Sequence, residues 1–91
     1  MVIKYFATLR DVTNIKEENL HLPPMMLSDL IQHLCGKYGK SFEKWVSCDH
    51  GGYGALSVFL VNGRDYRSLD GYETKLKDGD EISIFPPVAG G

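Results

Sequence analysis

The sequence predicts an α+β fold, in which a mixed sheet of four to five strands packs one main helix against one face. Strand-like segments occur near both ends of the chain, and one amphipathic helical segment lies between them. The order of elements is strand, strand, helix, strand, short strand, strand. A right-handed crossover through the helix would place the first and last strands side by side and parallel in the middle of the sheet.

Composition limits the classes of function. A chain of 91 residues can form one domain with a modest core, and 43% hydrophobic with 24% charged residues is typical of globular proteins. A net charge of −2 argues against a nucleic-acid partner. No apolar run has the length of a membrane span, and the first residues lack the pattern of a signal peptide. We therefore expect a cytoplasmic protein without membrane or nucleic-acid partners.

The first predicted strand covers residues 2–9, where side chains of high β propensity alternate. Alternation places Phe6 on the opposite face from the residues that we expect in the core, which are Ile3, Tyr5, Ala7 and Leu9. Residues 10–14 are polar and typical of a turn. A second strand is expected over 15–22, and Pro23 and Pro24 end it.

The main helix is predicted over 26–38. Its apolar residues recur at helical spacing and form one stripe, which is interpreted as the core face: Leu27, Leu30, Ile31, Leu34, Cys35 and Tyr38. Asp29 suits the positive end of the helix dipole, although no good N-cap residue precedes Leu27. Gly36 and Gly39 weaken the end of the helix, and 41–46 can form a further turn or two.

Residues 47–55 are expected to form a loop. Its glycines, Gly51, Gly52 and Gly54, could in principle cradle a phosphate group. Phosphate-binding glycines, however, lie between a strand and a following helix, whereas these follow a helix and precede a strand. A flexible connector is the better interpretation.

The remaining strands follow the loop. Residues 56–61 are almost all apolar and predict a central strand buried on both sides. Asn62-Gly63 is a strong hairpin signal, so 64–66 can form a short return strand. Residues 68–77 are irregular, and 78–80 predict a tight turn. The last strand is expected over 81–85, with Phe85 on the face opposite to Ile82 and Ile84.

The segment after the last strand is expected to form a thin tail, so that 1–85 form the domain and 86–91 the tail. Pro86 and Pro87 cannot continue a helix and fit poorly within a sheet. Gly90 and Gly91 carry no side chains and permit almost any backbone conformation. Such a tail ends in a carboxylate that a partner with a narrow channel could accept.

The uncovered face of the sheet would carry Phe6 and Phe85. An apolar patch rimmed by polar groups usually marks a protein interface. The alternative is that Phe85 forms a second small core against the tail.

A zinc site needs separate consideration, because His33, Cys35, Cys48 and His50 supply four possible ligands. On a helix, His33 and Cys35 would point about 200° apart, and their spacing is not that of a structural zinc site. We therefore expect no metal and no other cofactor. His21, His33 and His50 have no acid or nucleophile at a recognisable spacing, which argues against an enzyme.

Four stretches resemble the small subunit of molybdopterin synthase, within the ubiquitin-like or β-grasp group of sulfur carriers. They are Tyr5-Phe6-Ala7-Thr8-Leu9-Arg10, Leu60-Val61-Asn62-Gly63, Leu76-Lys77-Asp78-Gly79-Asp80-Glu81 and Phe85-Pro86-Pro87-Val88-Ala89-Gly90-Gly91. The chain departs from that family in a longer loop at 49–54, in Met26 where a capping Thr is usual, and in the polar pair Arg64-Asp65.

The resemblance implies a mechanism. An E1-like enzyme would activate the Gly91 carboxylate with ATP, and a sulfurtransferase or other sulfur source would convert the adenylate into a thiocarboxylate. The large subunit of molybdopterin synthase would then accept the tail and transfer the sulfur to precursor Z. The implied site has Gly91 as the attachment point and the following partner-binding residues: Gly90, Ala89, Val88, Pro87, Pro86, Phe85 and Phe6.

Two other functions remain open at this point. A ubiquitin-like modifier would use the same activation and join Gly91 to lysines of target proteins. A plain β-grasp interaction module would have an incidental Gly-Gly ending, and deletion of Gly90 and Gly91 would then leave its function intact.

Overall fold

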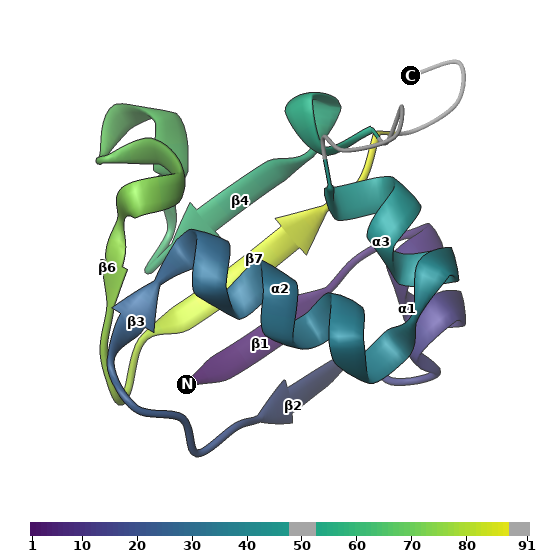
Figure 1. The fold of residues 1–91 in the computed structure, drawn as a ribbon, viewed down its shortest axis with the longest axis horizontal. Helices are drawn as coiled ribbons and strands as arrows, with labels where there is room; N and C mark the ends of the chain where they lie inside the picture. The colour runs from purple at the N-terminus through teal and green to yellow at the C-terminus, as the bar shows by residue number, and fades with distance from the viewer. Residues whose placement is uncertain (48–52, 88–91) are drawn as a thin grey trace.

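A computed structural model describes residues 1–47 and 53–87 of the chain (Figure 1). Its main sheet has five strands in the order β2-β1-β7-β4-β5. The strands are β1 (Val2–Tyr5), β2 (Glu17–Asn19), β4 (Val58–Val61), β5 (Arg64–Asp65) and β7 (Glu81–Phe85). β1 and β7 are parallel, with Ile3 opposite Ile82, and the other pairs are antiparallel. The predicted central pairing of the first and last strands is confirmed.

Helices cover one side of this sheet, and α2 runs across the front of β1 and β7 (Figure 1). The α-helices are α1 (Thr8–Thr13), α2 (Leu27–Tyr38) and α3 (Lys40–Val46), and the short 3-10 helices are η2 (Gly54–Leu56), η3 (Tyr66–Ser68) and η4 (Gly71–Glu73). Within the described ranges, no helix is long and apolar enough to cross a membrane.

The core lies between the helices and the inner face of the sheet. The inner face contributes Ile3, Tyr5, Phe59, Val61, Ile82 and Ile84, and α2 contributes Leu27, Leu30, Ile31 and Leu34. The apolar stripe predicted for the helix is therefore its core face, with Cys35 and Tyr38 at the margin of the core. The alternation predicted for 81–85 is also confirmed, because Ile82 and Ile84 are buried and Phe85 points to the other face.

The strand predicted over 2–9 is wrong beyond Tyr5. Ala7 has a φ of 52°, which turns the chain out of β1 and into α1. The expected turn at 10–14 is therefore mostly helix, closed at Asn14 by a left-handed residue with a φ of 65°. Ala7, expected in the core, is exposed, whereas Leu9 is buried from the helix rather than from a strand. β2 is likewise shorter than the predicted 15–22.

The predicted main helix is confirmed to within one residue of its start. Met26 supplies no capping side chain, but its backbone N–H donates to the Asp29 carboxylate at 3.1 Å. Gly39 ends α2 with a φ of 82°, and its N–H donates to the carbonyl of Cys35 at 2.8 Å. The further turn expected over 41–46 is α3.

The strand predicted over 56–61 begins only at Val58 and is not buried on both faces. Leu56 lies in η2 and is 66% exposed. In β4, Phe59 and Val61 are buried and Val58 and Leu60 are half-buried, because they face opposite sides of the sheet. The hairpin predicted at Asn62-Gly63 is confirmed, because β4 pairs antiparallel with β5 and Val61 lies opposite Arg64.

Within the predicted loop 47–55, residues 48–52 lie outside the described ranges. Gly54 begins η2, where a Cβ atom would lie 2.4 Å from the carbonyl oxygen of Val46, so the close approach of two backbones requires glycine.

The segment 68–77, predicted to be irregular, contains η4 and a strand, β6 (Lys75–Leu76). β6 pairs with β3 (Met25–Met26), just before α2, in a separate two-stranded sheet. The tight turn at 78–80 is confirmed, since the Asp80 N–H donates to the Lys77 carbonyl at 3.1 Å and Gly79 has a φ of 87°.

Candidate functional site

The outer face of the main sheet, opposite to the helices, carries an apolar surface. We call it the open face and define it by Val2, Phe6, Val58, Leu60 and Phe85. These side chains are half-buried and do not belong to the hydrophobic core. The register explains the grouping, because Val58 is directly opposite Phe85 and Leu60 is opposite Ser83. Strand alternation therefore leaves one apolar surface without a covering layer among the described residues.

Phe6 and Phe85 lie at one end of the open face, where β1 and β7 finish. Their rings are stacked, with centroids 4.2 Å apart and planes inclined by 14°. Phe6 follows the last residue of β1, and Phe85 is the last residue of β7, so the parallel pairing of these strands brings the rings together. The sequence placed both residues on one face, and the structure adds that they contact each other.

Arg10 extends this pair into a column of three side chains. Its Nε donates to the Tyr5 carbonyl at 2.9 Å, and its guanidinium carbon lies 5.2 Å from the centroid of the Phe6 ring. Within the described part of the chain, no carboxylate forms an ion pair with Arg10. The sequence does not indicate a role for Arg10, because the position of its side chain depends on the turn at Ala7.

Charged pairs lie within and beside the open face. Lys4, between Val2 and Phe6, forms an ion pair of 2.9 Å with Glu81 on the neighbouring strand β7, and Asp65 and Arg67 form one of 2.8 Å beyond β5. Exposed pairs of this kind add little stability. A protein interface typically combines apolar contacts with polar and charged groups of this kind.

The tail begins at the edge of this surface. Pro86, directly after β7, is buried and Pro87 is half-buried, so the packed part of the chain extends one residue beyond the strand. Of the predicted site residues, Val88, Ala89, Gly90 and Gly91 lie outside the described residues. The structure therefore brings Phe6, Phe85 and the first tail residues together at one end of the open face.

The histidines and cysteines do not form a second site within the described ranges. His33 and Cys35 both lie in α2, whereas Cys48 and His50 fall outside the described residues. Burial and, to a smaller extent, the nearby Glu43 carboxylate raise the pKa of the Cys35 thiol to about 11. The thiol is therefore protonated near neutral pH and is a poor nucleophile.

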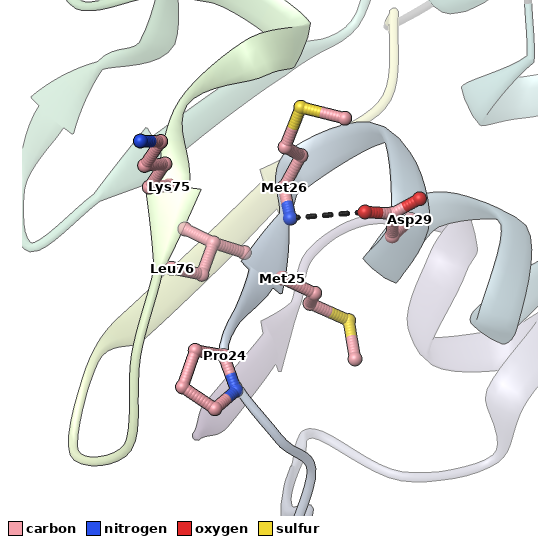
Figure 2. A pocket seen from close by; sticks show the side chains of 6 residues that line it. All are labelled: Pro24, Met25, Met26, Asp29, Lys75 and Leu76. Atoms are coloured by element: carbon pink, nitrogen blue, oxygen red, sulfur yellow. Dashed lines mark hydrogen bonds between the residues drawn. The ribbon is translucent and has the colours of Figure 1, made fainter.

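A shallow groove lies between β3, β6 and the start of α2. It has a volume of about 270 Å³ and is lined by Pro24, Met25, Met26, Asp29, Lys75 and Leu76 (Figure 2). Figure 1 shows β3 and β6 far from the C-terminal end of β7. The Asp29 carboxylate already accepts the Met26 N–H, and the lining contains no nucleophile beside a base. The groove thus offers hydrophobic contact rather than reaction chemistry.

Relatives of this chain include carriers and modifiers. Small archaeal modifier protein 3 of Haloferax volcanii is 35% identical over 94 aligned positions, which cover 98% of this chain and 96% of the relative. The molybdopterin synthase sulfur carrier subunit of Chlamydomonas reinhardtii is 29% identical over 90 positions, with 98% and 95% coverage.

Solved structures agree with the fold. The solution structure of small archaeal modifier protein 1 from Methanosarcina acetivorans superposes with a TM-score of 0.73 at 35% identity and covers 99% of this chain and 94% of that one. The fold is therefore a β-grasp, and the relatives fit a small sulfur carrier or ubiquitin-like modifier rather than a catalytic protein. The profile of the ThiS family matches residues 3–91, and this chain belongs to the ThiS family.

Proposed function

We propose that this protein is a sulfur carrier that delivers sulfur from a thiocarboxylate at Gly91, in the synthesis of molybdopterin. One observation carries the proposal. In a chain of the ThiS family, the apolar open face and its stacked Phe6–Phe85 pair lie at the start of a tail that ends in Gly90 and Gly91. A partner that docks on the open face would thereby receive the tail.

The chemistry requires activation, because a carboxylate is a poor electrophile. An E1-like enzyme would join Gly91 to AMP and release pyrophosphate. The outer sulfur of a sulfurtransferase persulfide would then attack the carbonyl carbon, so that a C–S bond forms as the C–O bond to AMP breaks. A second thiol would attack the resulting S–S bond, which releases the thiocarboxylate and leaves a disulfide. The adenylating residues belong to the partner in this scheme, and the carrier supplies the docking surface and an unobstructed terminus.

The lack of side chains at Gly90 and Gly91 suits this role. A Cβ atom at either position would widen the tail where it must enter a partner's active site. In the proposed pathway, the large subunit of molybdopterin synthase accepts the loaded tail. The Chlamydomonas relative, which is 29% identical, is named as a molybdopterin synthase sulfur carrier subunit, and this supports the proposed acceptor.

A second candidate function is protein modification, in which Gly91 forms an isopeptide bond with lysines of target proteins. The Haloferax relative, named as a small archaeal modifier, favours it at 35% identity. Both functions use the same activated terminus, so the open face supports each of them equally.

Intact mass spectrometry of the protein purified from its own cells tests the proposal, with an immunoblot for conjugates beside it. A carrier shows sulfur in place of one terminal oxygen and no larger species. A ladder of conjugates joined through Gly91 would identify a modifier instead. The matched control is a chain without Gly90 and Gly91, which should show neither product. If that variant functioned normally, the Gly-Gly ending would be incidental and the protein would be a plain interaction module.

A further inference from the structure

The backbone of Ala7 adopts a conformation that is unusual for a residue with a side chain. Its φ of 52° and ψ of −130° lie in a region that favours glycine. Among the described residues, Asn14 and Asn62 are the other non-glycine residues with positive φ. Asn14 lies in the left-handed helical region, with a ψ of 20°, which asparagine tolerates better than other non-glycine residues do. The Ala7 side chain is exposed, so burial does not compensate for the strain.

This conformation determines where Phe6 and Arg10 lie. The chain turns sharply at Ala7, and the first hydrogen bonds of the turn join the Leu9 N–H to the Phe6 carbonyl at 3.1 Å and the Arg10 N–H to the Ala7 carbonyl at 3.0 Å. The Phe6 side chain then lies between the Phe85 ring and the Arg10 guanidinium. A continuing strand at Ala7 would carry Arg10 away from Phe6.

We propose that Ala7 is a positioning residue, whose positive-φ backbone arranges Phe6 and Arg10 beside Phe85 before a partner protein binds at the start of the tail. The inference rests on the proposed function, because it concerns the surface that the activating enzyme would contact. Side chains ordered in advance need not be immobilised during association, and preorganisation of this kind increases affinity. Strained residues often persist at functional sites for this reason.

Valine at position 7 provides the first test. A branched Cβ makes a positive φ far costlier than alanine does, so Ala7→Val should drive the turn out of the observed conformation, and the pair Phe6–Phe85 should lose its fixed geometry. We expect the KM of the E1-like enzyme for the carrier to rise about tenfold with kcat unchanged. Ala7→Gly is the matched control and should leave KM unchanged, because glycine adopts this conformation more readily than alanine does.

D-Alanine at position 7 provides the complementary test. The mirror image of the observed dihedral angles lies close to the polyproline II region of an L-residue, so D-Ala7 fits the turn without strain and still restricts it. The variant can be assembled by ligating a synthetic peptide of residues 1–34 to a recombinant segment that begins at Cys35. We expect a normal KM together with a higher thermal midpoint.

NMR spectroscopy of the free carrier gives a readout that is independent of loading. Wild-type, D-Ala7 and Ala7→Gly proteins should show contacts between the ring protons of Phe6 and Phe85, and Ala7→Val should weaken them. Unchanged ring contacts and unchanged KM in Ala7→Val would overturn the inference. An equal rise of KM in Ala7→Gly, or a reduced kcat in Ala7→Val, would also overturn it by showing a merely structural role. If the wild-type protein accepts no sulfur, the proposed function fails, while the ring contacts still decide the role of Ala7.

Discussion

Phe59 and Phe85 lie on neighbouring strands of one sheet but have different surroundings. Phe59 is fully buried among core residues, and Tyr66 packs edge-on against it with ring centroids 5.2 Å apart. Phe85 is half-buried on the open face, where its close aromatic neighbour is Phe6. The same side chain should therefore contribute mainly to stability at one position and mainly to partner binding at the other.

Truncation of these two rings separates the contributions. Phe59→Ala should lower the free energy of unfolding by about 3–5 kcal/mol, as a core truncation does. Phe85→Ala should lower it by only about 1 kcal/mol, mostly through the lost stacking contact. Denaturant unfolding measures both values. The free energy of binding between Phe85→Ala and the E1-like enzyme should weaken by more than the free energy of unfolding falls. A loss for Phe85→Ala as large as that for Phe59→Ala would show that Phe85 belongs to a second core.

At the scale of elements, the two glycines near the end of α2 have opposite roles. Gly36 lies within the helix, where an added Cβ atom would meet nothing within 4 Å. Gly39 joins α2 to α3 with a φ of 82° and a ψ of −163°, a combination that is essentially restricted to glycine. The joint between α2 and α3 therefore requires Gly39, whereas Gly36 lowers the stability of α2.

Alanine substitutions at these glycines should change stability in opposite directions. Gly36→Ala should raise the free energy of unfolding by about 0.5–1 kcal/mol, because alanine has the higher helix propensity. Gly39→Ala should lower it by about 1–3 kcal/mol through backbone strain. Thermal unfolding of the two variants beside wild type measures both effects. A stabilising effect of Gly39→Ala would mean that the joint between α2 and α3 is not strained.

Local periodicity predicted the long elements of this fold and failed for the short ones. The stripe of α2 spans three turns, so it specified the helix and its core face. In α1, the spacing of Leu9, Val12 and Thr13 at i, i+3 and i+4 was a helical signal, but the alternation of residues 2–9 obscured it. The pairing of β3 with β6 involves two residues on each strand, and such a short contact depends on tertiary structure rather than on local pattern.

The open face was predictable for the same reason as the core. Strand alternation places Phe6 and Phe85 away from Tyr5 and Ile84, without knowledge of the fold. The contribution of Arg10 was not predictable, because nothing in the sequence indicates a positive φ at an alanine. Site residues on regular strands thus follow from the sequence, whereas those positioned by a strained turn require the structure.

At the scale of the whole molecule, one carboxylate joins the sheet to the helix layer. Glu18, on β2, accepts hydrogen bonds from Tyr5 on β1 at 2.6 Å, and from Lys37 and Tyr38 at the end of α2. Its side chain is 13% exposed, and Tyr5 is fully buried. Burial raises the pKa of Glu18, but the hydrogen bonds from Lys37, Tyr38 and Tyr5 together outweigh that effect and hold the pKa below its ordinary value.

This lowered pKa predicts that acid destabilises the fold through Glu18. The unfolded chain binds the proton at a higher pH than the folded protein does, so protonation favours unfolding. The stabilising contribution is complete above the unfolded pKa of about 4.3 and is lost as the pH falls through the lower folded value. Burial and, after it, the hydrogen bond to this carboxylate raise the pKa of the Tyr5 hydroxyl, which therefore remains a donor throughout this range.

Glu18→Gln tests this assignment, with Glu17→Gln, an exposed neighbour on the same strand, as the matched control. Glu18→Gln should lower the free energy of unfolding at pH 7 by about 1–3 kcal/mol, because a charged acceptor of three hydrogen bonds is replaced by a neutral one. Its stability should also fall less steeply than that of wild type below about pH 5, since the titrating group has been removed. Denaturant unfolding across pH 3–7 measures both effects. If Glu18→Gln and Glu17→Gln showed the same acid dependence as wild type, other carboxylates would have to account for the acid sensitivity. Asp80 would then be the first to test, because it is 5% exposed and hydrogen bonds from Asn62 and Lys77 lower its pKa despite burial.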